Sequence, residues 1–368
     1  MRRTTISVAG MPLPDPDAPP LSFFEFWPAW AFYGPVWLWI LGLMVRHRSI
    51  RMPLLANPCF PAGGLVGEEK SVLFSLFTGP ERDRLPDWML VKKWRGSAEQ
   101  QLSVVESRML AAGLSYPLVA KPDIGCRGAG VRPLRDRSDL LRYLADFPNG
   151  EKLLLQRMVD WEGEAGVFYA RQPGQARGTI ISLTLKYFPH VVGDGRATLR
   201  ELILRDSRAG LVPHLYLDRF ADRLDQVLPV GEVQRLVFSG SHSKGAVFRN
   251  GNAWITEAMR ARFDAIADGI PEFHFGRFDV RFNDFEAFRR GEDFAIIEFN
   301  GAGAEATHIW DSSTRLIDAW RALFSQFSIL FRLGAANRAR GFRPEGWRAF
   351  FNRWRAEKTL SGRYPLTE

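Results

Sequence analysis

Residues 116–131 read YPLVAKPDIGCRGAGV, a short apolar run followed by Lys-Pro and a glycine-rich segment. The apolar run at 118–120 is typical of a buried strand, and Lys121 would carry a positive charge from its end into a cleft. Glycines let backbone N–H groups approach phosphate oxygens closely and allow positive φ angles, and three follow in short order: Gly125, Gly128 and Gly130. We therefore expect a phosphate-binding loop. A glycine-rich hairpin beside a solvated lysine is the alternative.

Length and charge set the first limits on the class of protein. A chain of 368 residues is long enough for two or three packed lobes. The net charge is +8, and residues 311–368 hold eleven basic against five acidic residues, so most of the excess lies in the C-terminal tail. Aromatic residues interleave with those arginines, which favours an anionic membrane surface over wrapped nucleic acid. The two cysteines, Cys59 and Cys126, lack metal-ligand spacing and fit a reducing compartment.

An uncharged stretch near the N-terminus has the length of a membrane span. Residues 1–25 form a proline-rich arm, and the 20 residues at 26–45 (FWPAWAFYGPVWLWILGLMV) carry no charge. Basic residues follow from Arg46 onward, so by the positive-inside rule we expect the rest of the chain on the cytoplasmic side. The expected location is a bacterial-type inner membrane. Pro28 and Pro35 leave a monotopic hairpin or an interfacial helix open, and a buried core helix is a further alternative.

The remaining chain alternates strand and helix patterns. Residues 52–70 are rich in proline and glycine and predict a loop or linker. Helical spacing predicts helices at 99–112, 138–147, 198–205 and 256–270. Apolar or alternating runs predict strands at 153–158, 166–170, 179–185, 235–238, 277–282 and 294–299, the last two separated by a polar hairpin at 283–293.

Two predicted strands carry oxygen ligands. In GRFDVRF (276–282) Asp279 sits between apolar neighbours, and in AIIEFNGAG (295–303) Glu298 and Asn300 share one face of their strand. Hard oxygen ligands of this kind suit Mg²⁺ that bridges nucleotide phosphates. Arg277 lies on the same strand face as Asp279, where it could stabilise a developing oxyanion. The alternative is that Asp279 only pairs with Arg277 or Arg281.

Taken in order, these motifs resemble the ATP-grasp family over about residues 118–307. The segment KYFPHVVGDGRATLRELILRDSRAG (186–210) narrows the resemblance to the ATP-grasp domain of cyanophycin synthetases and bifunctional glutathione synthetases, among the D-alanine–D-alanine ligase-like enzymes. The stretches VLPVGEVQRL (227–236) and SGSHSKGAVF (239–248) are similar to the same enzymes. The resemblance implies an α+β fold in which two lobes clasp ATP.

The resemblance also implies roles for individual residues. ATP would contact Lys121 and the loop that holds Gly125, Arg127, Gly128 and Gly130, while its adenine and ribose would meet Gln156, Arg157, Met158 and Glu164. One or two Mg²⁺ ions, or Mn²⁺, would bind Asp279, Glu298 and Asn300, and the catalytic cations would be Arg277 and Lys186. The family usually has a further lobe in front that supplies another basic residue, and Lys92 or Lys93 is the expected substitute.

The tail predicts two amphipathic helices, at about 316–331 and 347–354. Each would lie at a membrane interface or dock on the core. The expected organisation is an arm (1–25), a hydrophobic membrane segment (26–51), a linker and small N-terminal lobe (52–115), an ATP-grasp domain (116–310) and a basic helical tail (311–368).

The expected activity is that of a Mg²⁺- and ATP-dependent carboxylate–amine ligase at the cytoplasmic membrane surface. It would act through an acyl phosphate on a small-molecule, lipid-linked or cell-envelope substrate and would not bind nucleic acid. A kinase that phosphorylates a hydroxyl group, or a non-catalytic ATP-binding membrane protein, is the alternative.

Overall fold

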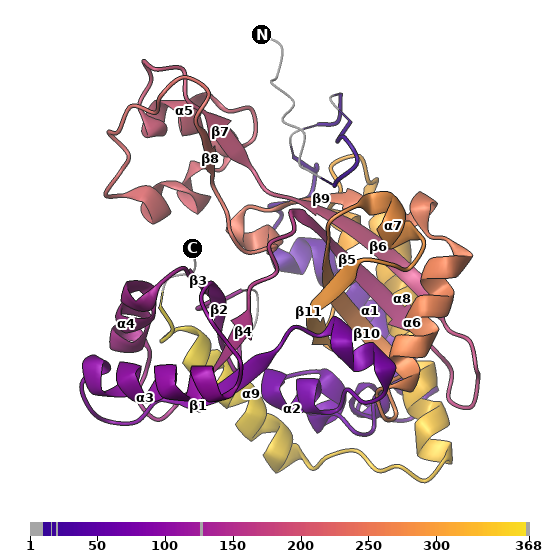
Figure 1. Cartoon of the computed structure of the whole chain (residues 1–368). Coiled ribbons are helices and arrows are strands. Elements are labelled where there is room, and N and C mark those ends of the chain that lie inside the picture. The colour runs from indigo at the N-terminus through magenta and orange to yellow at the C-terminus, as the bar shows by residue number, and fades with distance from the viewer. Residues whose placement is uncertain (1–9, 16, 20, 126–127, 366–368) are drawn as a thin grey trace.

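Two antiparallel sheets dominate the computed structural model, which describes residues 10–15, 17–19, 21–125 and 128–365 (Figure 1). The smaller sheet comes from the N-terminal half of the chain and the larger one mostly from the C-terminal half. A third, smaller lobe lies beyond them. The mixed α+β architecture expected from the sequence is confirmed.

The smaller sheet has the strand order β1-β4-β2-β3 and is covered by α3 and α4. Strand β2 is buried at every position because it lies between β3 and β4, which explains its uninterrupted apolar run. A capping box between Ser97 and Gln100 begins α3, and the Asp136 carboxylate caps α4. The bounds are β1 (Trp88–Lys92), α3 (Ala98–Ala111), β2 (Leu118–Pro122), β3 (Arg132–Leu134), α4 (Arg137–Asp146) and β4 (Lys152–Arg157).

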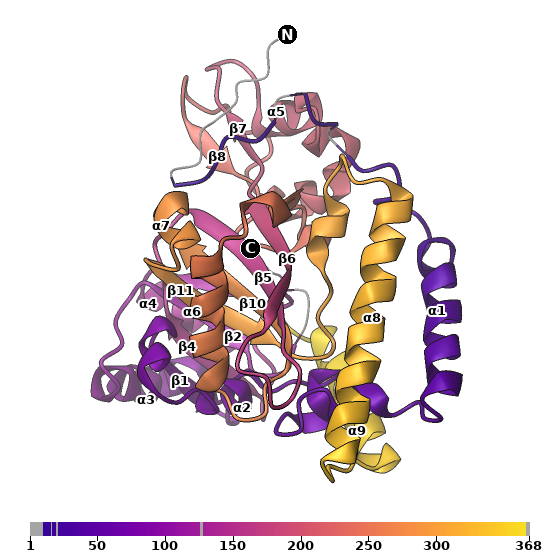
Figure 2. The ribbon, with the colours of Figure 1, turned by 90° about the vertical axis from the view of Figure 1, so that its right-hand side faces the viewer.

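The larger sheet has the order β11-β10-β5-β6-β9 and is covered on both faces. Successive residues of a strand point to opposite faces, so Val167 packs into the core under α6 and α7 while Phe168 packs into the core under α8 (Figure 2). The bounds are β5 (Gly163–Ala170), β6 (Thr179–Tyr187), β9 (Val247–Asn250), α6 (Glu257–Asp268), β10 (Phe275–Phe282), α7 (Phe285–Arg289) and β11 (Phe294–Asn300).

The third lobe projects from the larger sheet at the upper left of Figure 1. It holds β7 (His190–Val192), α5 (Leu199–Arg205) and β8 (Val233–Arg235) around a small core of its own. The predicted strand at 235–238 is wrong in its bounds. Strand β8 ends at Arg235 because Leu236 and Val237 turn into the core of this lobe.

Two segments expected to be irregular are packed structure. The polar hairpin at 283–293 contains α7, whose Phe285 and Phe288 enter the main core. The supposed linker at 52–70 holds two buried 3₁₀ turns, Met52–Leu55 and Pro61–Gly64, before α2 (Lys70–Ser75) begins. Its Asn57 is fully buried and bonds to the backbone of His274 and Phe275, so this segment belongs to the core.

The long apolar helices lie side by side, as Figure 2 shows. Helix α1 (Ala29–Arg46) packs on α8 (Leu316–Ala339), and the indole N–H of Trp39 donates to Phe324 O and Ser328 Oγ. Helix α8 in turn docks on the core through buried Gln326 and Asn337, which bond to backbone at Ala304, Ala306 and Leu55. Of the two expectations for this helix, docking on the core is the one confirmed. The last helix, α9 (Trp347–Ser361), is mostly exposed.

Candidate functional site

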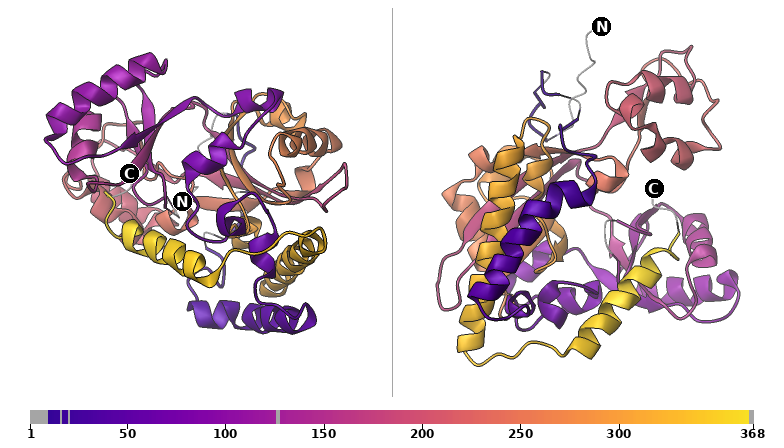
Figure 3. Two further views of the ribbon diagram at one scale, coloured as in Figure 1. Left: turned by 90° about the horizontal axis from the view of Figure 1, so that it is seen from below. Right: turned by 180° about the vertical axis from the view of Figure 1, so that it is seen from behind.

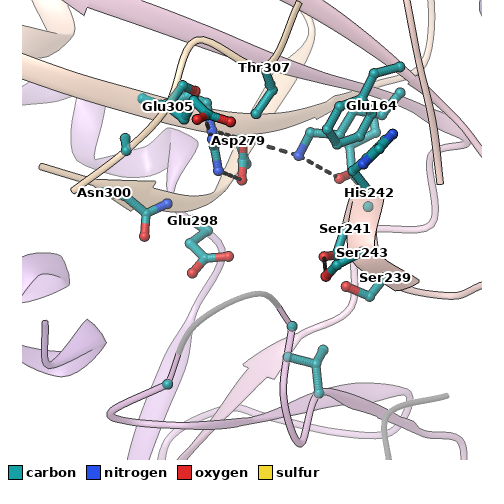
Figure 4. A pocket seen from close by; sticks show the side chains of 18 of the residues that line it. Glu164, Ser239, Ser241, His242, Ser243, Asp279, Glu298, Asn300, Glu305 and Thr307 are labelled. Atoms are coloured by element: carbon teal, nitrogen blue, oxygen red, sulfur yellow. Dashed lines mark hydrogen bonds and ion pairs between the residues drawn. The ribbon is translucent and has the colours of Figure 1, made fainter. Parts of the chain in front are cut away.

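A cavity of about 860 Å³ lies between the two sheets, and most of the residues predicted to form the site line it (Figure 4). Both sheets contribute to its walls, as does the segment 238–243 that precedes β9. Figure 4 shows Glu298 and Asn300 on one side of it and Ser239, Ser241 and Ser243 on the other. Residues from the N-terminal segment 25–33 also line it.

Lys121 lies at the end of β2, where the sequence placed it. Its Nζ donates to Gln156 Oε1 at 2.7 Å and to Ile297 O at 2.9 Å, so it joins the two sheets across the cavity. Burial lowers the pKa of Lys121 to about 8, although nearby Glu298 favours the charged form. An anionic group bound beside Lys121 would stabilise the charged form that burial disfavours.

The glycine loop is only partly in the cavity. Gly125 and Gly128 line it, whereas Gly130 does not; its carbonyl accepts a hydrogen bond from Tyr143. Gly128 has φ +72°, and a Cβ there would come within 2.5 Å of Ser239 Oγ, so Gly128 can approach the opposite wall only because it has no side chain. The predicted contact Arg127 lies outside the described residues.

The predicted adenine-binding residues Gln156, Arg157 and Met158 all line the cavity. Lys121 can only donate, so it fixes the amide oxygen of Gln156 and turns Nε2 the other way. That Nε2 is buried and has no hydrogen-bond partner among the described residues. An orphaned buried donor in a cavity wall indicates a ligand acceptor at this position. Arg157 instead pairs with Asp87 at the surface.

A buried ladder of ion pairs crosses the strands β6, β5 and β10. Lys186 Nζ lies 3.1 Å from both Glu164 Oε1 and Asp279 Oδ1, and Arg277 Nε donates to Asp279 Oδ1 at 2.9 Å. Burial alone would raise the pKa of Asp279, but Arg277 and Lys186 outweigh it and lower that pKa. Arg281 pairs with Glu164 instead, so of the alternative partners considered for Asp279 only Arg277 is confirmed.

The register of the sheet brings the predicted metal ligands together. Asp279 on β10 lies directly opposite Glu298 on β11, and Asn300 is opposite Arg277. Directly opposite residues of an antiparallel pair point to the same face, which is the face of the cavity. No group of three His, Cys, Asp or Glu residues in the described chain is close enough to hold a metal by itself. The donor set of two carboxylates and an amide fits Mg²⁺, which binds proteins through one or two carboxylates and completes its shell with phosphate and water.

The structure adds charged residues that the sequence did not single out. Lys70 lies 3.4 Å from Glu298 Oε1 and donates to Gly125 O, so it connects the carboxylate to the glycine loop. Burial raises the pKa of Glu68 to about 8, although a hydrogen bond from Gly301 N–H acts to lower it. Both residues come from the stretch taken for a linker, and no periodicity there pointed to them.

The prediction that Lys92 or Lys93 supplies the basic residue of the family's front lobe is wrong. Lys93 is buried in the smaller sheet's own lobe, and its Nζ donates to the carbonyl of Phe147. Lys92 is exposed at the end of β1 and does not line the cavity. Lys70 is the cation that this part of the chain brings next to Glu298.

The matches of this chain to known proteins are distant ones. No family model matches the chain, and a search of curated proteins found no match. Among solved structures, a bifunctional glutathione synthetase from Pasteurella multocida matches with 16% identity over 70% of this chain and 36% of its own, at a TM-score of 0.34. The match thus spans about a third of that synthetase.

Two further solved structures match at similar levels. The VanG D-Ala:D-Ser ligase from Enterococcus faecalis has 12% identity over 73% of this chain and 62% of its own, with a TM-score of 0.38. The ATP-grasp ligase PsnB has 11% identity over 70% of this chain and 59% of its own, with a TM-score of 0.35. The chain is thus similar, at low identity, to parts of these solved structures.

Proposed function

We propose that this protein is a Mg²⁺- and ATP-dependent ligase that joins a carboxylate to an amine through an acyl phosphate. The observation that carries the proposal is one cavity in which buried cations face a set of oxygen ligands. Lys121 and Lys186 supply positive charge, Glu298 and Asn300 supply oxygen donors, and Arg277 and Asp279 lie between them. Phosphoryl transfer requires little covalent help from a protein and depends on such placed charges.

ATP would lie between the sheets. Lys121 and the backbone at Gly125 and Gly128 would bind its phosphates, and the orphaned Nε2 of Gln156 would donate to the base. Glu164 would accept from the ribose hydroxyls. Its two oxygens already bond Lys186 and Arg281, but a carboxylate has about four acceptor positions, so capacity remains.

The reaction then follows from the placement of charges. A substrate carboxylate oxygen attacks the γ-phosphorus, the bond to ADP breaks, and an acyl phosphate forms; an amine next attacks the acyl carbon, phosphate leaves, and the amine loses a proton. Arg277 would hold the negative oxygens of the acyl phosphate, and Lys186 would keep Asp279 ionised. Mg²⁺ bound by Asp279, Glu298 and Asn300 would supply further neutralisation of phosphate charge. Gly125 and Gly128, which line the cavity, would help to exclude water from the intermediate.

ATP binding should take up protons at a pH just above 8. The pKa of Lys121 is about 8 in the free protein, and phosphate oxygens beside it favour the ammonium form, so binding raises this pKa. Well below that pH Lys121 is already charged and contributes no uptake. Calorimetry in two buffers of different ionisation enthalpy measures the effect. The interpretation fails if Lys121→Met takes up as many protons as the wild type.

A membrane-surface location is the second part of the proposal. Helix α1 is long and apolar enough to cross a membrane by length and composition. It packs on α8, however, and α8 carries exposed Arg321, which would enter the hydrocarbon beside a spanning α1. Apart from Trp39, which faces α8, the large exposed apolar residues of α1 form one stripe opposite the buried ones: Trp30, Trp37, Leu38, Leu41 and Val45. This pattern favours a helix that lies in the interface of the cytoplasmic leaflet.

Basic residues border the same surface. Exposed Arg46 ends α1 and exposed Arg48 follows it. The Arg51 guanidinium lies 5.9 Å from the ring of Trp347, which begins the basic helix α9. Figure 3 shows α1 and α9 on the same side of the molecule. A surface with apolar and cationic residues side by side complements an anionic leaflet.

Binding to vesicles should depend on the apolar stripe. The double variant Trp37→Ser/Leu41→Ser should bind phosphatidylglycerol vesicles at least tenfold more weakly, because each side chain contributes about 2 kcal/mol when buried. Cosedimentation measures this, and Leu110→Ser, which changes an exposed apolar residue on α3, is the control. Equal binding of the double variant and the control would exclude α1 as the membrane contact.

The product of ATP consumption tests the chemistry. Detergent-purified protein is incubated with Mg²⁺, ATP, membrane lipid extract and pooled metabolites, and products are followed by mass spectrometry with Asp279→Ala as control. A product lighter by one water than acid plus amine, formed only by the wild type, is expected. A gain of one phosphoryl group would instead establish the kinase, and inertness of both proteins would favour the binding protein.

A further inference from the structure

The N-terminal segment forms one end wall of the cavity. Its residues that line the cavity are aromatic or small, apart from Glu25: Phe26, Trp27, Ala29, Phe32 and Tyr33. They come from the first turns of α1 and from the residues just before it. The helix with the exposed apolar stripe therefore also completes the site.

Hydrogen bonds tie this wall to the residues expected to handle the acyl group. Tyr33 Oη donates to Glu305 Oε2 at 2.7 Å, and the indole N–H of Trp310 donates to Glu305 Oε1 at 2.8 Å. Arg277 donates to the carbonyl oxygen of the same Glu305 at 3.1 Å. The end of the cavity beside α1 is thus the end at Arg277.

Aromatic rings surround this end of the cavity. Phe32 packs on Trp310 with ring centroids 4.9 Å apart, and Trp310 stacks on His242 at 5.4 Å. Leu65 and Phe248 also line the cavity. These side chains give the end beside α1 a mainly apolar lining.

The two carboxylates at this end are already bonded to other side chains. Glu25 pairs with Arg208 at 2.6 Å and with His242 at 2.9 Å, and Glu305 accepts the bonds from Tyr33 and Trp310. The cavity lysines lie further along, in the ladder and at the end of β2. The cavity therefore has a charged part and an apolar part that meet at Arg277.

The apolar part continues to the outside of the molecule. Phe26 lines the cavity and is 53% exposed, and Trp30, in the first turn of α1, is 72% exposed. Neighbouring Phe23 is also exposed. The right-hand view of Figure 3 shows α1 lying along the outer face here. The apolar surface of the cavity and the apolar stripe of α1 are thus joined at the start of this helix.

We infer that the carboxylate substrate is an amphiphile with a long acyl chain, bound with its carboxylate at Arg277 and its chain along the α1 wall. The guanidinium complements the carboxylate, and the aromatic wall complements the chain. The exposed continuation on α1 lets the chain pass between a bilayer and the cavity without crossing water. This inference rests on the proposed ligase, because it takes Arg277 as the acyl end of the site.

Chain-length dependence tests the inference. With Mg²⁺ and a non-hydrolysable ATP analogue bound, calorimetry compares dodecanoate with butanoate, both below micelle-forming concentrations. Each methylene that enters an apolar subsite tightens binding about fourfold, so dodecanoate should bind at least about thirtyfold more tightly. Equal affinities for the two acids, with the ATP analogue bound normally, would overturn the inference and leave the proposed ligase standing. Failure to bind the analogue would count against the ligase itself.

Variants of the cavity wall at the start of α1 test where the acyl chain binds. Ala29 lines the cavity at an exposed position at the start of α1, so the indole of Ala29→Trp should occupy space that the acyl chain needs. This variant should weaken dodecanoate binding at least tenfold, while butanoate and the ATP analogue bind as before. Phe26→Ser, at another exposed position, should weaken dodecanoate binding without filling the cavity. Leu110→Trp is the control on α3 and should change nothing. If neither wall variant weakens dodecanoate binding, the chain lies elsewhere and the inference is wrong.

Discussion

Replacing Glu298 by Gln should lower the turnover number for ATP about a thousandfold while the protein stays folded. The substitution keeps the size of the side chain and removes only its charge. Removal of one charged or hydrogen-bonding group aimed at the transition state typically costs about 10²–10³ in rate. The Glu298 side chain is 31% exposed and faces the cavity, so the loss of its charge should leave the core intact.

Steady-state ADP formation and circular dichroism together measure this effect. The matched control is Glu292→Gln, because Glu292 precedes β11 on the surface and pairs only with Arg290 among the described residues. It should retain wild-type turnover. If Glu298→Gln turns over ATP at the wild-type rate, Glu298 takes no part in binding the metal or the phosphates, and the proposed site is wrong.

Replacing Lys186 by Met should cost about 3–5 kcal/mol of unfolding free energy, because removing one partner from a buried ion pair leaves uncompensated charge in a medium that solvates it poorly. Lys186 is the shared cation between Glu164 and Asp279, and all three side chains are less than 10% exposed. Arg277 and Arg281 would still face the two carboxylates, so the fold should survive in weakened form.

Urea unfolding followed by tryptophan fluorescence measures this cost. The control is Lys152→Met, which removes an ion pair with Glu69 of nearly the same length, 2.9 Å, from a position where the lysine is 46% exposed. That change should cost at most about 1 kcal/mol. Equal destabilisation by the two substitutions would show that the ladder around Lys186 is no stronger than a surface pair.

The sequence was most informative where strand geometry fixes the outcome. Glu298 and Asn300 are two residues apart, so any strand places them on one face, and the structure does so. The buried run before Lys121 also predicted β2 well. The sequence does not determine the register between β10 and β11. The connection between these strands is long, and its length does not fix which residues pair. The structure supplies that register and sets Asp279 opposite Glu298.

Long-range packing accounts for what the sequence did not reveal. Glu68 and Lys70 enter the site from a segment whose proline and glycine content predicted a linker. Their position depends on Asn57 and its bonds to the backbone near β10, more than 200 residues away in the chain. An amphipathic pattern shows that a helix has an apolar face, but not whether lipid or protein packs against that face. Helix α8 covers the core, whereas α1 keeps an exposed stripe.

Trapping of the acyl phosphate tests the central claim most directly. Hydroxylamine attacks an acyl phosphate in place of the natural amine and gives a hydroxamate, so the amine need not be known. The protein is incubated with Mg²⁺, ATP, membrane lipid extract and hydroxylamine, and the products are separated by mass. The proposal predicts a hydroxamate heavier than its parent acid by one NH unit, formed only with ATP and lost in Glu298→Gln. ATP consumption that yields a stable phosphorylated product and no hydroxamate would contradict it.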